Sequence, residues 1–115
     1  MGTEGWGGNS RNVIIRRSDD GGISWTFPRD SLSEGVIKCG KFSTAPVPVV
    51  IYNGRIWRAM ETGVKGEVPR AFVMSAPINS NLMKAESWVS TNGIAFNSEW
   101  FDCEAVGRRK CCYCT

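Results

Sequence analysis

Short apolar runs alternate with glycine-rich polar turns along the chain, and this pattern predicts an all-β protein. The runs are rich in β-branched and aromatic residues and are bounded by Gly, Asn and Pro, as strands are. The main predicted strands span residues 12–18, 47–52, 55–61 and 70–76. Shorter ones are predicted at 25–27 and 88–90, and weaker candidates lie at 94–96 and 100–101. One or two helical turns are predicted within residues 78–86.

Turn chemistry sets the order of these strands. Asn53-Gly54 joins two of the runs, and both residues tolerate positive φ, which makes this pair the strongest short signal for a hairpin. Residues 28–46 are polar and contain glycine, so they are predicted to connect two groups of strands. Residues 62–69 are predicted to form a loop.

The stretch SDDGGISW, residues 18–25, is called the Asp20 turn below. Gly21 and Gly22 supply the positive φ that a tight turn needs. The Asp20 carboxylate and the Ser18 hydroxyl can bond turn N–H groups that would otherwise lack partners. Trp25 is expected to fold its ring over the hairpin and become buried. Each residue type therefore has a structural use, and none is poised as a nucleophile or a base.

Composition narrows the function classes. The chain has 115 residues, 42% of them apolar, which suits one modest domain with a core. It has no histidine, which excludes histidine-based triads and histidine metal ligands. The net charge of +3 is small and dispersed, so no nucleic-acid partner is predicted. No apolar stretch approaches the ~18 residues of a membrane span, and residues 1–8 lack the pattern of a signal peptide.

The cysteines are concentrated at the end of the sequence. Four of the five lie in the last 13 residues, where they lack paired C-x₂-C arms, so neither a metal site nor a cofactor is predicted. Residues 101–115 are interpreted as an atypical tail rich in cysteine and basic residues. A reading-frame change or a truncated gene would produce such a tail, with its junction between residues 98 and 106.

The sequence motif Ser-x-Asp-x-Gly-x-x-Trp in the Asp20 turn resembles the Asp-box, or BNR repeat, of sialidases and related β-propellers. Residues 44–88 also resemble a blade of exo-α-sialidase-like proteins, and with RNVIIRRSDDGGISWT the resemblance covers roughly residues 11–100. A weak internal repeat supports it, because Ser24-Trp25 recurs as Ser87-Trp88, 63 residues later.

The resemblance implies a fragment of about one and a half blades of a sialidase-type β-propeller within residues 1–100, with a blade boundary near 28–46. Strands 12–18 and 24–27 would close one blade. Strands 47–52, 55–61, 70–76 and 88–90 would form the next. The Asp-box closes a hairpin in that family and does not catalyse. Its residues here are Ser18, Asp20, Gly21, Gly22 and Trp25.

The same resemblance directs catalysis to the face opposite the Asp-boxes. Sialidases bind the substrate carboxylate with three arginines, and use a Tyr nucleophile assisted by Glu and an Asp acid–base. Here the family's Arg-Ile-Pro motif is replaced by Pro46-Val47-Pro48. Tyr52 lies at the wrong end of its strand, and Tyr113 lies in the tail. Loops on the implied active face carry Arg29, Asp30, Glu34, Lys38, Glu61, Glu67 and Arg70.

The best remaining catalytic candidates are Arg58, Glu61 and Arg70. The alternative for each is structural: polar contacts along a strand for Arg58 and Glu61, and a solvated strand end for Arg70. By resemblance, the chain is predicted to be a fragment of a sialidase-like glycoside hydrolase acting on sialylated glycans, and inactive alone. The first alternative is a non-catalytic Asp-box propeller that binds a glycan or a protein. The second is a remnant of an interrupted gene, without a function of its own.

Exposed sheet edges in such a fragment predict self-association. The sequence does not indicate a cellular location, although proteins of the resembled family are often periplasmic or secreted.

Overall fold

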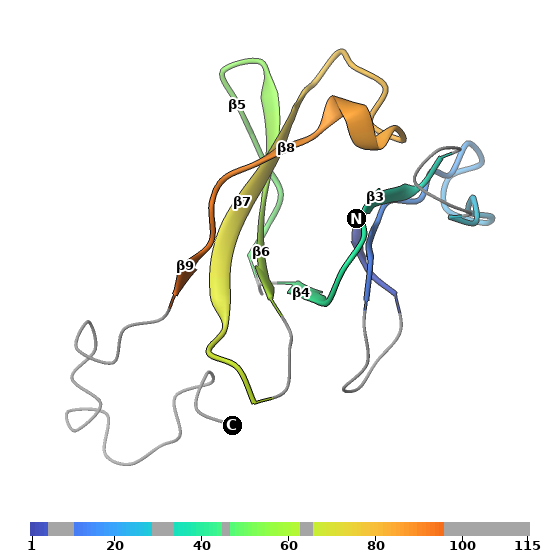
Figure 1. The fold of residues 1–115 in the computed structure, drawn as a ribbon. Coiled ribbons are helices and arrows are strands. Elements are labelled where there is room, and N and C mark those ends of the chain that lie inside the picture. Colours follow the sequence, from blue (N-terminus) through green and yellow to red (C-terminus); the bar gives the residue numbers. More distant parts are fainter. Residues whose placement is uncertain (5–10, 29–33, 45–46, 63–65, 96–115) are drawn as a thin grey trace, which may run out of the picture.

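The computed structural model describes residues 1–4, 11–28, 34–44, 47–62 and 66–95. In these ranges the protein is all-β apart from one short 3-10 helix, and its strands form two antiparallel sheets (Figure 1). The first sheet has the order β1-β2-β3 and contains three short strands: β1 (Gly2–Thr3), β2 (Val13–Ile14) and β3 (Val36–Lys38).

Two long central strands dominate the second sheet. β6 (Arg55–Thr62) pairs with β7 (Arg70–Pro77) in one unbroken register, from Arg55 opposite Pro77 to Glu61 opposite Ala71. β4 (Phe42–Thr44) and β5 (Val50–Tyr52) both pair with β6 on its other side. β8 (Val89–Ser90) and β9 (Ile94–Ala95) both pair with β7. Six strands therefore occupy four positions of an antiparallel meander.

The predicted hairpin between β5 and β6 is confirmed. Asn53 and Gly54 both have positive φ, 50° and 70°, as a two-residue turn between right-twisted strands requires. The strand predicted at 47–52 starts only at Val50. Pro48 precedes it and has no N–H to donate to the ladder with β6, which accounts for the late start.

Several predicted strands are confirmed and others need correction. β6, β7 and β8 confirm the runs at 55–61, 70–76 and 88–90, and β9 confirms part of 94–96. The 3-10 helix η1 (Ala85–Ser87) overlaps only the end of the range 78–86, where helical turns were predicted. Of the strand predicted at 12–18, only Val13 and Ile14 form a strand, β2, and residues 25–27 do not form a strand. β3 and β4 lie within 28–46, which was predicted to be a connection, and β1 was not predicted. The candidate at 100–101 lies outside the described residues.

Side-chain hydrogen bonds explain why 25–27 does not form a regular strand. The Thr26 amide donates to the Arg17 carbonyl at 2.9 Å, but the Arg17 amide donates to the Thr26 hydroxyl, also at 2.9 Å. The hydroxyl thus replaces one rung of the ladder. Ile15, two residues earlier, donates its amide to the Gly35 carbonyl instead.

The hydrophobic core lies between the two sheets. Val13 and Ile37 from the first sheet join Met60, Phe72 and Met74 from one face of β6 and β7. Ala76 and Trp88 complete this cluster. Because residues two apart in a strand share a face, alternate positions of the long strands build the core. No helix long and apolar enough to cross a membrane occurs in the ranges described.

Candidate functional site

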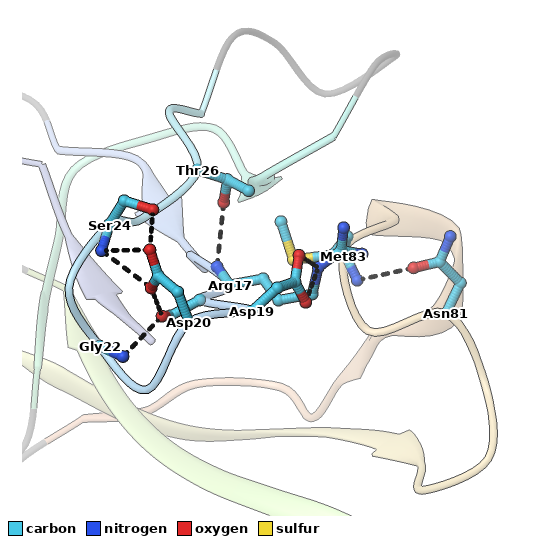
Figure 2. Close-up of polar contacts among 9 residues, drawn as sticks. Arg17, Asp19, Asp20, Gly22, Ser24, Thr26, Asn81 and Met83 are labelled. Carbon is cyan, nitrogen blue, oxygen red and sulfur yellow. Dashed lines mark hydrogen bonds and ion pairs between the residues drawn. The ribbon is translucent and has the colours of Figure 1, made fainter.

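The Asp20 turn is held together by a dense set of hydrogen bonds around one carboxylate (Figure 2). Asp20 accepts the Ser18 hydroxyl at 2.8 Å and the Ser24 hydroxyl at 2.5 Å. Its two oxygens also accept the backbone N–H of Ser24, at 2.9 and 3.1 Å. The Ser18 hydroxyl in turn accepts the Gly22 amide at 2.8 Å. These contacts satisfy turn donors as the sequence predicted.

The charge of Asp20 is maintained by these donors. Its pKa is lowered to about 2, first by the Ser24 side-chain hydrogen bond, then by the Ser24 backbone amide and the Ser18 hydroxyl. Gly21 and Gly22 adopt φ of 74° and 93°, in the left-handed region that side chains disfavour. A carboxylate already bound by so many turn donors suits a structural role better than proton transfer.

Trp25 closes the turn, but not by burial. Its indole N–H donates to the Gly22 carbonyl at 3.0 Å, so the ring does fold back over the turn. The side chain is nevertheless 53% exposed, and the prediction that it is buried is wrong. Ile23 and Phe27 beside it are exposed as well.

The turn between β7 and β8, residues 78–88, repeats part of this arrangement and is called the Trp88 turn. The Trp88 indole N–H donates to the Leu82 carbonyl at 3.0 Å, as Trp25 does to Gly22. The Thr91 amide donates to the Val73 carbonyl at 2.9 Å, and the Val73 amide donates to the Thr91 hydroxyl at 3.0 Å.

This second pair of bonds has the same form as the pair between Arg17 and Thr26. The Trp88 turn therefore lacks the Asp and the two glycines of the Asp20 turn, but the same indole contact and threonine rung occur at it. Sequence reasoning found the Ser-Trp repeat and missed the threonines, because Thr26 follows its tryptophan by one residue and Thr91 by three. Unlike Trp25, Trp88 is buried in the core.

The three catalytic candidates do not form one cluster. Arg58 pairs in register with Met74, and Arg70 lies two residues before Phe72 on β7. Met74 and Phe72 belong to the core, so Arg58 and Arg70 lie on the core-facing side of the second sheet. Glu61 is three residues from Arg58 in the same strand, so its side chain lies on the opposite face.

Each candidate has a local environment. Arg58 donates through Nη1 to the Val47 carbonyl, which ties β6 to the segment before β5. Glu61 is partly buried beside Ser43 and Ala71, and burial raises its carboxyl pKa. Arg70 begins β7 at the surface, where its amide donates to the Thr62 hydroxyl at 2.9 Å. Catalytic roles for these residues stay predictions.

A cleft of about 210 Å³ opens where β6 ends and β7 begins, at the end of the sheet away from the Trp88 turn. Among the residues that the resemblance placed on the active face, Lys38 and Arg70 line this cleft. Its full lining is Lys38, Phe42, Thr62, Arg70, Phe72, Thr91 and Gly93. We call it the β6–β7 cleft.

The other residues assigned to that face are scattered. Glu34 was predicted to lie at the same end as the cleft, but the neighbouring Gly35 donates its amide to the Met83 carbonyl of the Trp88 turn. That contact places Glu34 at the opposite end of the sheet, because β3 runs from the turn end towards the cleft. Glu67 is exposed in the loop before β7. Arg29 and Asp30 lie outside the described residues.

Comparison with known protein families, with characterised proteins and with solved structures finds no match for this chain. In the ranges that the structure describes, no three His, Cys, Asp or Glu side chains gather into a group that could hold a metal ion. Cys39 is exposed and forms no disulfide within the described residues. The four tail cysteines, Tyr113 and the predicted junction at 98–106 lie outside the described residues.

Proposed function

We propose that this chain is part of a sialidase-like β-propeller whose parent protein hydrolyses sialylated glycans, and that the chain itself does not catalyse. The observation that carries the proposal is the hydrogen-bonded Asp20 turn. Ser18, Asp20, Gly22 and Trp25 all make hydrogen bonds within this turn, which supports its resemblance to an Asp-box.

The partial repeat supports the same proposal. In both the Asp20 turn and the Trp88 turn, the tryptophan indole donates a hydrogen bond to a carbonyl of the same turn. Just after each turn, a threonine hydroxyl accepts an amide of the preceding strand segment. Propeller blades are four-stranded antiparallel sheets that pack face to face. The second sheet has four strand positions, and the first sheet packs on one of its faces. Such a pair of units is what successive blades would contribute.

Catalysis by the isolated chain is not supported. Glu61 lies across the sheet from Arg58 and Arg70, so the three cannot act on one substrate from one face. Tyr52 sits beside the Asn53-Gly54 turn and is exposed, at the opposite end of β6 from the β6–β7 cleft. A nucleophilic tyrosine and the remaining arginines would have to come from further blades of the parent.

A non-catalytic binding propeller is the second candidate. The β6–β7 cleft favours it, because the described residues of its lining include two cations and no carboxyl group that could act as a general acid or base. These residues can hold an acidic ligand, and none of them is suited to cleave it.

We also propose that the chain self-associates through β5. Val50, Ile51 and Tyr52 are 50%, 67% and 71% exposed, and β5 pairs with β6 on one side. An uncharged apolar edge strand is a ready template for pairing with another strand. Association through this edge would cover part of the exposed apolar surface.

The first experiment is the intact mass of the natural product in its source organism, captured with an antibody to residues 44–60. A mass several times 12.7 kDa supports a multi-blade parent, which is then assayed with a fluorogenic sialoside. Release of free sialic acid supports the hydrolase. Glycan binding without release supports the second candidate. A natural product of 12.7 kDa contradicts both.

A further inference from the structure

The β6–β7 cleft brings together two cationic side chains from different sheets. Lys38 ends β3 in the first sheet, and Arg70 begins β7 in the second. The Lys38 ammonium lies 5.9 Å from the ring centroids of both Phe42 and Phe72. The cation therefore stands over the apolar wall of the cleft instead of extending into solvent.

Neither cation has a carboxylate partner in the described part of the chain. The ion pair found there is between Arg17 and Asp19, at the Asp20 turn. No side-chain hydrogen bond of Lys38 or Arg70 occurs among the described residues, and none of the described residues that line the cleft is an Asp or a Glu. Two like charges that share one cleft repel each other, so an anion between them would be stabilised by both.

The backbone around Arg70 holds this cation at the cleft. The Thr62 hydroxyl accepts the Arg70 amide at 2.9 Å and so fixes the first residue of β7. On the other side, a Cβ at Gly93 would lie 3.2 Å from the Arg70 Cβ. The absence of a side chain at Gly93 thus leaves room for the Arg70 stem beside β9. The guanidinium is the group that best matches an oxyanion, because its N–H donors form a planar fork.

The cleft is larger and more apolar than a site for a bare ion. Its volume of about 210 Å³ is several times the ~30 Å³ that one water molecule occupies in the liquid. Phe42 and Phe72 form its wall and meet edge to face, with centroids 5.5 Å apart and planes at 65°. Such a wall can pack against the apolar face of a sugar or aromatic ring.

We propose that the β6–β7 cleft binds a small organic oxyanion, with the charged group between Lys38 and Arg70 and the attached ring against Phe42 and Phe72. Carboxylated or sulfated saccharides and aromatic acids share this chemistry. The site needs no hydrolytic activity, so it does not depend on the function proposed above.

The test is an NMR titration of the full 115-residue chain at constant ionic strength. The probes are sodium glucuronate and sodium benzoate, each with a neutral counterpart of similar ring, methyl glucoside and benzyl alcohol. We expect the anions to cause saturable shifts in the amides of Thr62, Arg70 and Gly93, and the neutral compounds to cause none. Preference for glucuronate would identify a saccharide ligand, and preference for benzoate an aromatic acid.

Three substitutions locate the effect. Lys38→Gln and Arg70→Gln should each weaken anion binding about tenfold or more, as the loss of a charge-assisted hydrogen bond does. Arg16→Gln removes the same charge from a side chain stacked on Phe27, outside the cleft, and should leave binding unchanged. If Lys38→Gln disturbs the core, Arg70→Gln carries the test, because Arg70 is exposed.

Absence of saturable shifts in the unsubstituted chain would overturn the proposal. So would equal binding of a neutral counterpart, or an Arg16→Gln effect as large as that of Arg70→Gln. Sialoside hydrolysis by the parent is measured separately. Anion binding without hydrolysis would refute the hydrolase alone, and hydrolysis without binding at this cleft would refute the cleft alone.

Discussion

Replacing Met60 with alanine tests whether the two sheets share one core in solution. Met60 is fully buried on β6, opposite Phe72 on β7 and Thr44 on β4, and belongs to the cluster that joins Val13 and Ile37 of the first sheet. Its position at the centre of that cluster makes it sensitive to the packing between the sheets.

The magnitude follows from the atoms removed. Met60→Ala deletes three heavy atoms, and at ~0.8 kcal/mol for each buried methylene-sized group the lost transfer free energy is roughly 2.4 kcal/mol. The cavity that remains adds to this, because a core flanked by β-strands collapses only in part. We therefore expect a loss of about 3 kcal/mol in the free energy of unfolding, within the ~2–5 kcal/mol typical of such substitutions.

The assay is urea unfolding followed by tryptophan fluorescence, at a concentration where light scattering shows a monomer. Trp88 lies in the same cluster, so the emission of this tryptophan, one of five in the chain, depends on the packing of the core. With a urea dependence of ~1–3 kcal/mol/M, the midpoint should fall by about 1 M or more. Ile51→Ala is the control, because Ile51 on the neighbouring strand is 67% exposed and should change stability by less than about 0.5 kcal/mol. A Met60→Ala effect no larger than that of Ile51→Ala would show that the first sheet does not pack on the second.

Three further predictions concern the turn and the edge. Asp20 has a folded-state pKa of about 2, below that of an unfolded aspartate, so its contribution to stability is complete above pH ~4 and is lost as the pH falls towards 2. An NMR titration of the Asp20 carboxyl should show this pKa, and Ser24→Ala should raise it; a midpoint near 4 in the unsubstituted chain would contradict the hydrogen-bonded turn. Gly22→Ala should destabilise by about 1–2 kcal/mol in urea unfolding because φ is 93° there, whereas Gly2→Ala, where no atom lies within 4 Å of the new Cβ, should be nearly neutral; equal effects would refute the strain. Ile51→Lys should shift the chain towards monomer in sedimentation velocity, and Ile23→Lys, at an isoleucine that is even more exposed but lies outside β5, should not; an equal shift would point to non-specific adhesion.

The predictable part of the fold is the part with strong local signals. β6 and β7 are long and alternate cleanly, and Asn53-Gly54 sets the hairpin that joins β5 to β6. β3 and β4 were not predicted because they are short and a glycine interrupts the apolar pattern between them. Gly40 has a φ of 152°, and a Cβ there would meet the Phe42 ring at 2.6 Å. That close approach depends on tertiary packing and is not encoded in local periodicity.

The candidate site was predictable only in pieces. The Asp20 turn could be read from spacing, because all of its contacts are made within eight residues. The alternation of β6 already separates Arg58 from Glu61, since an odd spacing in a strand puts two side chains on opposite faces. The β6–β7 cleft could not be foreseen, because it requires β3 to pack beside β7 and the position of β3 was unknown.

The threonine rung beside the Trp88 turn has a consequence for engineering. Thr26 and Thr91 close the same kind of rung on turns of different length, so the rung does not depend on how many residues lie between the strands. The pairing of the two strands therefore does not depend on the length of the turn that joins them. A foreign peptide grafted between Asn79 and Ser80 would therefore be displayed on the outside of the sheet, while the indole of Trp88 and the hydroxyl of Thr91 continue to anchor both ends.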